Sequence, residues 1–256
     1  MSDRQTSVGR WRFDTGQLLP TNDSASIPLL RLLAATNDVM LLQKLVVIAR
    51  DRADAANDFQ KDILSGELGY FIRMLCGHLY EAGIAYRAIE THLRDQIDQL
   101  VGASAAARQA FGMLRKIYHD QSDGGFEKAV LGPIRNLAGF HYKEKSFLEG
   151  LAALKAPGEL ILSEHIGFTR YVLADDVLTA KTWEIMGGFG KYKETVATAF
   201  LLADELAIAV THLLKYRLDR EKIQLTESYG SVPIPHEILR TRDKIEADRE
   251  KTKELS

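Results

Sequence analysis

The sequence has one cysteine, Cys76, and only six prolines among 256 residues. A single cysteine excludes an intramolecular disulfide and the cysteine pairs that structural zinc sites use. Cys76 stands in FIRMLCGHLY, where apolar residues recur at helical spacing, so we interpret it as a small buried side chain and not as a nucleophile. The scarcity of proline leaves long stretches that a helix can occupy without interruption.

The chain also has no marked excess of either charge. It contains 33 basic and 35 acidic residues, and the formal net charge of −2 gives no overall attraction to nucleic acid. The N-terminal segment includes no apolar signal core, and no apolar run approaches the roughly 20 residues of a membrane span. We therefore expect a cytoplasmic protein that does not enter a membrane.

Strong metal, nucleotide and hydrolase motifs are missing from the sequence. There is no HExxH, no glycine-flanked nucleophilic serine, and no Glu-x-x-His pair on the predicted helices. GGFGKYKET places Lys191 after glycines, but no buried strand precedes it, and we interpret this segment as a loop at the start of a helix. We therefore expect no cofactor and no metal ion.

Hydrophobic residues, at 46% of the chain, recur mostly three and four positions apart. The pattern is clearest over 66–99, where apolar positions alternate with charged ones at helical spacing. A first helix is expected to begin after Ser26, with the polar residues 36–38 as a possible point of division. Further helices are expected at 104–118, 126–131, 134–155, 175–187 (DDVLTAKTWEIMG) and 191–222.

These elements predict an all-α fold, a helical bundle. Residues 159–173 depart from the helical pattern, because ELILSE and FTRYVLA carry β-branched and aromatic residues with partial alternation. We expect a short strand-like hairpin insert there. The predicted organisation is a loosely ordered lead-in over 1–25, a single helical domain over 26–226, and a charged tail over 227–256.

One segment, IRNLAGFHYKEK at 134–145, combines residues suited to chemistry on a phosphodiester. Arg135 and His141 are six positions apart, which on a continuous helix separates them by about 120° and lets both flank one groove. Arginine presents a cationic fork suited to phosphate, and histidine moves protons near neutral pH. Asn136 adds an amide that can orient the histidine or a ligand.

We therefore predict that Arg135, Asn136 and His141 form a catalytic group. His141 would take the proton of a ribose 2′-hydroxyl or protonate the leaving oxygen, and Arg135 would stabilise charge on the phosphoryl oxygens. The adjacent residues Tyr142, Lys143 and Lys145 are candidates for binding the RNA backbone or stacking on a base. An acidic residue on the 66–99 helix, either Glu81 or Glu90, is a candidate to orient His141.

Two other histidines, His78 and His119, are weaker candidates for a functional role. His78 falls on the apolar face of the 66–99 helix and is expected to be a core side chain. His119 and Asp120 stand beside the glycine-containing loop HDQSDGG, where we expect them to be solvated.

The Arg135-Asn136 pair followed by Phe140-His141-Tyr142 resembles the motif of the HEPN superfamily. The resemblance implies a helical bundle that pairs as a homodimer, with two motifs facing each other in one composite ribonuclease site. It also implies metal-independent cleavage to a 2′,3′-cyclic phosphate and a 5′-hydroxyl, and an antitoxin or defence-system partner. A long stretch of chain, 143–256, follows the motif here, whereas compact members carry it near their C-terminal helix, and the 159–173 insert is not part of the minimal bundle.

The main alternative is a non-enzymatic helical binding or scaffold protein. In that reading Arg135, Asn136 and His141 hold helices together or bind a nucleotide. The two hypotheses differ in one observable respect, because catalysis requires Arg135 and His141 to be open to a groove.

Overall fold

The computed structural model describes residues 5–138, 148–149, 151–152 and 172–233. Within them the chain forms a helical bundle, which confirms the predicted all-α class. The elements in chain order are β1 (Gln5–Arg12), α1 (Thr15–Leu18), α2 (Ser26–Ala55), α3 (Asp58–Ala103), α4 (Ala105–Tyr118), the π-helix η1 (Glu127–Leu131), α5 (Gly132–Ala138), α7 (Val172–Ile185), α8 (Phe189–Arg220) and β2 (Thr226–Pro233).

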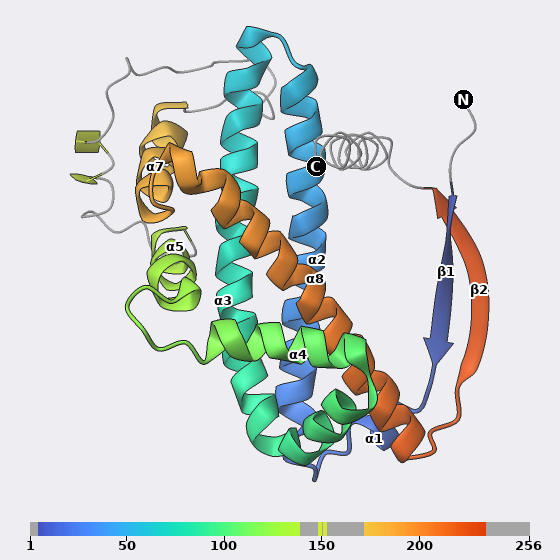
Figure 1. The fold of residues 1–256 in the computed structure, drawn as a ribbon. Helices are drawn as coiled ribbons and strands as arrows, with labels where there is room; N and C mark the ends of the chain where they lie inside the picture. Colours follow the sequence, from blue (N-terminus) through green and yellow to red (C-terminus); the bar gives the residue numbers. More distant parts are fainter. Residues whose placement is uncertain (1–4, 139–147, 150, 153–171, 234–256) are drawn as a thin grey trace, which may run out of the picture.

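Two long helices, α2 and α3, run side by side in opposite directions and form the centre of the bundle (Figure 1). Only Ala56 and Asn57 separate them. The Asn57 side chain accepts a hydrogen bond from the Gln60 backbone N–H at 2.9 Å, and the Gln60 side chain accepts one from the Asn57 N–H, so a capping box starts α3. This short link places the two helices in an antiparallel hairpin.

The first helix is not divided at 36–38, as the sequence had suggested. It continues through Thr36, whose hydroxyl donates to the Leu32 carbonyl at 2.7 Å. Thr36 is buried, and this local hydrogen bond satisfies its hydroxyl within the helix. A polar residue on the buried face therefore costs the helix little here.

Helices α4 and α8 cross one face of the α2–α3 pair (Figure 1). The predicted start of α4 is confirmed, because the Ser104 hydroxyl accepts a hydrogen bond from the Ala107 N–H. The core between the four helices contains Cys76, as predicted, and is dominated by aliphatic and aromatic side chains. Its largest fully buried members include Leu29, Leu75, Leu79, Tyr86, Ile89, Phe111, Leu114 and Tyr118.

Gly83 allows α4 to approach α3 closely. A Cβ at this position would lie 2.5 Å from two ring atoms of Tyr118, whose hydroxyl donates to the Leu79 carbonyl at 2.8 Å. Arg87, one turn further along α3 from Gly83, donates to both carboxylate oxygens of Glu127 at 2.8 and 2.7 Å, and to the Tyr118 carbonyl. These contacts fix the start of η1, which continues directly into α5.

The observed α3 is longer than the predicted 66–99 helix and bends near its end. Leu93 has non-helical backbone angles (φ −122°, ψ 25°) inside the helix. Neither proline nor glycine occupies this position, so residue type gave no signal for the bend.

The strand-like insert predicted at 159–173 lies mostly outside the described residues. Its last two residues, Val172 and Leu173, begin α7 and are helical, so the predicted hairpin does not reach that far. Strand propensity is a weak preference for such residues, and the packing of α7 against α3 and α5 outweighs it.

The strands of the structure occur elsewhere. β1 and β2 form a two-stranded antiparallel ribbon beside the bundle, with Gln5 opposite Pro233 and Arg12 opposite Thr226 (Figure 1). β1 lies in the segment expected to be a loosely ordered lead-in, and β2 begins just before the expected charged tail. The two strands come from opposite ends of the described chain, so neither segment alone shows that it has a pairing partner.

Two helices, α2 and the Lys191–Arg220 part of α8, are long and apolar enough to cross a membrane by length and composition. No such stretch had been expected from the sequence. Core helices of soluble proteins meet the same criterion, and both helices contribute buried residues to the core described above. The finding is therefore weak evidence for a membrane span.

Candidate functional site

Arg135 lies on α5 where that helix packs against α3. The two helices are close here, since a Cβ on Gly77 of α3 would be in ordinary contact, 4.0 Å from the Cα of Arg135. The Arg135 Nε donates to Oε1 of Glu81 at 3.0 Å, and Nη2 lies 3.0 Å from the same oxygen. The guanidinium carbon lies 5.9 Å from the ring centroid of Tyr80. The neighbouring side chains of α3 thus hold the guanidinium in one orientation.

The Arg135 guanidinium nevertheless stays open to solvent. The side chains of Arg135 and Glu81 are each 40% exposed. Asn136 is exposed, and its Oδ1 accepts a hydrogen bond from Arg135 Nη1 at 3.4 Å. The predicted neighbours Arg135 and Asn136 therefore contact each other, and the arginine can still meet an anion from solution.

The remaining predicted site residues, His141, Tyr142, Lys143 and Lys145, lie outside the described residues. Their predicted roles stay predictions.

The two candidate acidic partners of His141 have different surroundings. Glu81 contacts Arg135. Glu90 is buried, and its Oε1 accepts from Arg115 Nε at 2.5 Å while its Oε2 lies 2.7 Å from His119 Nε2. Nine positions separate the two glutamates on α3, which places them on opposite sides of the helix, about 13 Å apart along its axis. Of the two, only Glu81 is close to Arg135 and Asn136.

His119 is more strongly held than the sequence suggested. It is the C-cap residue of α4 and is 48% exposed, as expected for a residue beside a loop, but a buried carboxylate faces its Nε2. Arg115 extends the cluster, because its Nη2 donates to Asp98 at 2.8 Å. The interactions join the end of α4 to α3 and give Glu90 a structural role.

His78 is the residue whose position differs most from its prediction as a core side chain. It is 26% exposed, and its Nδ1 lies 3.3 Å from Oδ2 of Asp38 on α2. Asp38 and His78 are distant in the sequence, and only the register of the α2–α3 hairpin brings them together. Such a register cannot be predicted from helical periodicity alone.

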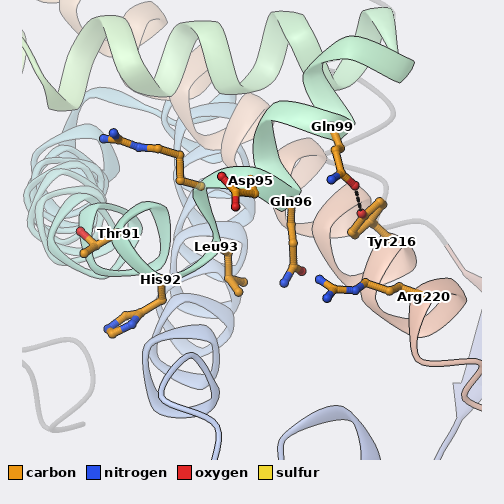
Figure 2. A pocket seen from close by; sticks show the side chains of 9 residues that line it. Thr91, His92, Leu93, Asp95, Gln96, Gln99, Tyr216 and Arg220 are labelled. Carbon is orange, nitrogen blue, oxygen red and sulfur yellow. Dashed lines mark hydrogen bonds between the residues drawn. The ribbon is translucent and has the colours of Figure 1, made fainter.

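A second surface feature is a pocket of about 530 Å³ at the bend of α3. Figure 2 shows its lining, with the Arg220 side chain extending toward Gln96 and the Tyr216 hydroxyl donating to Gln99. His92, at one margin, has its Nδ1 3.3 Å from the Ser24 hydroxyl. The lining residues are Thr91, His92, Leu93, Arg94, Asp95, Gln96, Gln99, Tyr216 and Arg220. Almost all of them are polar, in contrast to the mostly apolar pockets that hold drug-sized ligands.

The glycines before α8 serve the turn that starts this helix, in agreement with the interpretation from the sequence. Gly187 and Gly188 have positive φ angles of 84° and 86°, which favour glycine, and the Lys191 N–H donates to the Gly188 carbonyl at 3.1 Å. Among the described residues, no group of three or more His, Cys, Asp or Glu side chains is placed to hold a metal ion.

No protein-family model matches this chain, and no curated protein or solved structure shows significant similarity to it. Support for a function therefore comes from the residues themselves.

Proposed function

We propose that this chain is a HEPN-like, metal-independent endoribonuclease that acts as a homodimer. The observation that carries the proposal is the half-exposed guanidinium of Arg135, which Glu81 holds at 3.0 Å and Asn136 at 3.4 Å on the open side of α5. A fixed and solvent-accessible arginine beside an exposed amide is suited to binding a phosphodiester.

The proposed reaction is transfer of a phosphoryl group within the RNA strand. His141 takes the proton of a 2′-hydroxyl as that oxygen attacks phosphorus, and the bond from phosphorus to the 5′-oxygen breaks. Arg135 stabilises the charge that builds on the non-bridging oxygens. Tyr142, Lys143 and Lys145 would hold the strand on either side of the scissile bond.

The proposed homodimer is supported by exposed apolar side chains on α2, the helix whose Asp38 faces His78. Three α2 side chains, Ile27, Leu30 and Leu41, are 65%, 51% and 57% exposed. At 100° per residue, all three fall within about 80° of Asp38 round α2, on the side that meets His78. Exposed apolar side chains on one side of a helix favour association, and a second copy of this chain is the occupant that would complete the proposed site.

An antitoxin or defence-system partner and a cytoplasmic location belong to the same proposal. The partner follows from the resemblance to HEPN proteins, and the location follows from the expectation, drawn from the sequence, of no signal core and no membrane span. An antitoxin would act by covering the Arg135 side of the bundle.

The test is RNA cleavage in the presence of a chelator. We expect the wild type to cleave, and His141→Ala or Arg135→Ala to lose at least about a hundredfold in rate, as for removal of a proton-transfer or charge-stabilising group. His212→Ala, a substitution of a partly exposed histidine on α8, is the matched control and should keep full activity. Equal cleavage by wild type and His141→Ala would refute the assignment of His141.

Two further measurements complete the test. Leu41→Lys should shift the dimer toward the monomer in sedimentation and reduce cleavage in parallel. A wild type that cleaves no RNA would favour the alternative of a binding or scaffold protein. A His141→Ala protein that is several kcal/mol less stable in a thermal melt would identify His141 as a core histidine.

A further inference from the structure

Two ion pairs are neighbours on the open side of α3. His78 faces Asp38 of α2 at 3.3 Å, and Glu81 faces Arg135 of α5 at 3.0 Å. Residues three apart on a helix have Cβ atoms roughly 5–6 Å apart, so His78 and Glu81 stand side by side. Asp38, His78, Glu81 and Arg135 therefore form one row across three helices, which we name the α3 row.

The α3 row faces away from α4, which covers another side of the bundle. Gly83, against which Tyr118 of α4 packs, lies about 140° round α3 from His78 and about 160° from Glu81. Asp38 is 55% exposed, and Glu81 and Arg135 are less exposed but still open. A ligand can therefore reach these side chains from solution.

We propose that the α3 row is a phosphodiester site in which His78 is a proton-transfer residue. Asp38 faces Nδ1, which leaves Nε2 as the nitrogen available to a substrate. A carboxylate on one ring nitrogen fixes the orientation of the imidazole. Arg135 supplies the positive charge that places the phosphate next to it.

This proposal rests on the proposed function, from which it takes RNA as the substrate. It adds the protonation of the leaving 5′-oxygen, which the proposed function does not assign to a residue. Cleavage through the 2′-hydroxyl needs one group to take a proton and another to give one. The imidazolium form of His78 donates its Nε2 proton to the 5′-oxygen as the bond from phosphorus to that oxygen breaks. The products are a 2′,3′-cyclic phosphate, a 5′-hydroxyl and neutral His78, which is protonated again from water.

A purely structural role explains the Asp38–His78 pair less well. The α2–α3 hairpin is already held by a buried apolar interface that includes Leu32, Val39 and Leu75. A pair this exposed adds little to such an interface. Substitution of His78 should therefore leave the fold intact and change the chemistry.

The experiment uses two RNA substrates with the full chain. One is an ordinary RNA, and the other carries sulfur in place of the bridging 5′-oxygen at the cleavage site. Because a thiolate leaves without a proton, His78→Gln should cleave ordinary RNA about a hundredfold more slowly and the sulfur-containing RNA at nearly the wild-type rate. Asp38→Asn should show the same pattern more weakly, and His212→Gln should match the wild type on both substrates.

Two outcomes would overturn the assignment of His78. The first is equal slowing on both substrates, which indicates a structural role. The second is an unchanged rate on ordinary RNA. Both are distinct from failure of the proposed function, in which the wild type cleaves neither substrate.

If the wild type cleaves neither substrate, a binding measurement tests whether the α3 row is a phosphodiester site. The imidazole resonances of His78, assigned by comparison with His78→Gln, are followed by NMR while a 2′-deoxy oligonucleotide is added. A shift that saturates in the wild type and is lost in Arg135→Ala supports the phosphodiester site even without cleavage. Resonances that do not move would overturn it.

Discussion

Glu81 receives both contacts from Arg135 on a single carboxylate oxygen, Oε1, with Nε and Nη2 each 3.0 Å away. The two residues are distant in the sequence and come from different helices. The carboxylate fixes the plane of the guanidinium, and so it determines where a bound phosphate would lie.

Glu81→Gln is expected to slow RNA cleavage by about tenfold, because a charge-assisted hydrogen bond that orients Arg135 is weakened by roughly 1.4 kcal/mol. The free energy of unfolding should change by less than about 1 kcal/mol, since the pair is partly exposed and screened by solvent. Initial cleavage rates and urea denaturation measure the two effects. Glu67→Gln on the same helix is the control, and a variant that loses stability without losing rate would argue against an orienting role.

Gly83→Ala should destabilise the protein by about 2 kcal/mol, because its Cβ would overlap the ring of Tyr118 and α4 would have to move away from α3. The ring cannot easily give way, since the Tyr118 hydroxyl is held by its hydrogen bond to the Leu79 carbonyl. Gly112→Ala on α4 is the matched control, because a Cβ there has no neighbour within 4 Å. That change should stabilise the helix by about 0.5–1 kcal/mol. Thermal or urea unfolding should show a lower free energy of unfolding for Gly83→Ala and a higher one for Gly112→Ala. Changes of the same sign in both variants would contradict the close packing of α4 on Gly83.

The thiol of Cys76 should be unreactive in the folded protein. Cys76 is fully buried, and burial raises the pKa of its thiol to about 12, so almost no thiolate forms at pH 8. A thiol reagent should label the chain rapidly in denaturant and, without denaturant, only as fast as the protein unfolds. Rapid labelling of the native protein would mean that the core around Cys76 opens locally.

The Asp23–Arg217 pair should make stability depend on pH in the acidic range. A hydrogen bond from Arg217 and a second from the Ala25 N–H lower the pKa of Asp23, while partial burial acts in the opposite direction. Because the folded pKa lies below the unfolded value of about 3.9, the contribution is complete above about pH 4 and is lost as the pH falls through the folded pKa.

The corresponding variant is Asp23→Asn. At pH 7 it should be less stable than the wild type by about 1 kcal/mol, and the difference should shrink on acidification below pH 4. Unfolding midpoints across pH 2–7 test this, with the exposed Asp219→Asn as the control. A difference that stays constant over the whole range would show that Arg217 does not act on a charged Asp23.

Much of the helical architecture was predictable because it depends on local signals. The three- and four-residue spacing of apolar residues identified α3, and Ser104 marked the start of α4 through its side-chain cap. The continuity of α2 through Thr36 was harder to predict. A run of polar residues suggests that a helix ends, and the sequence does not show that the Thr36 hydroxyl bonds to a carbonyl of its own helix. The bend at Leu93 has no signal in residue type.

The candidate site was predictable only in part. Arg135 and Asn136 were proposed from their chemistry, and the structure shows only that they contact each other. Glu81 was named as an acidic partner, although for His141 and not for Arg135. His78 was interpreted as a core residue because it lies among apolar positions of α3. Its pairing with Asp38 depends on how two helices are aligned, and that alignment is set by many weak packing contacts along both.

The antiparallel ribbon has a consequence for how the chain is made. β1 leaves the ribosome before the described helices of the bundle, and its partner, β2, is synthesised only after them. The helices between the two strands can therefore collapse first. Only after that collapse does the entropic cost of bringing β1 and β2 together fall, because the long chain between them is then compact. Pairing of the two strands then follows the collapse of the described helices, and it reports that a chain has been translated at least as far as Pro233.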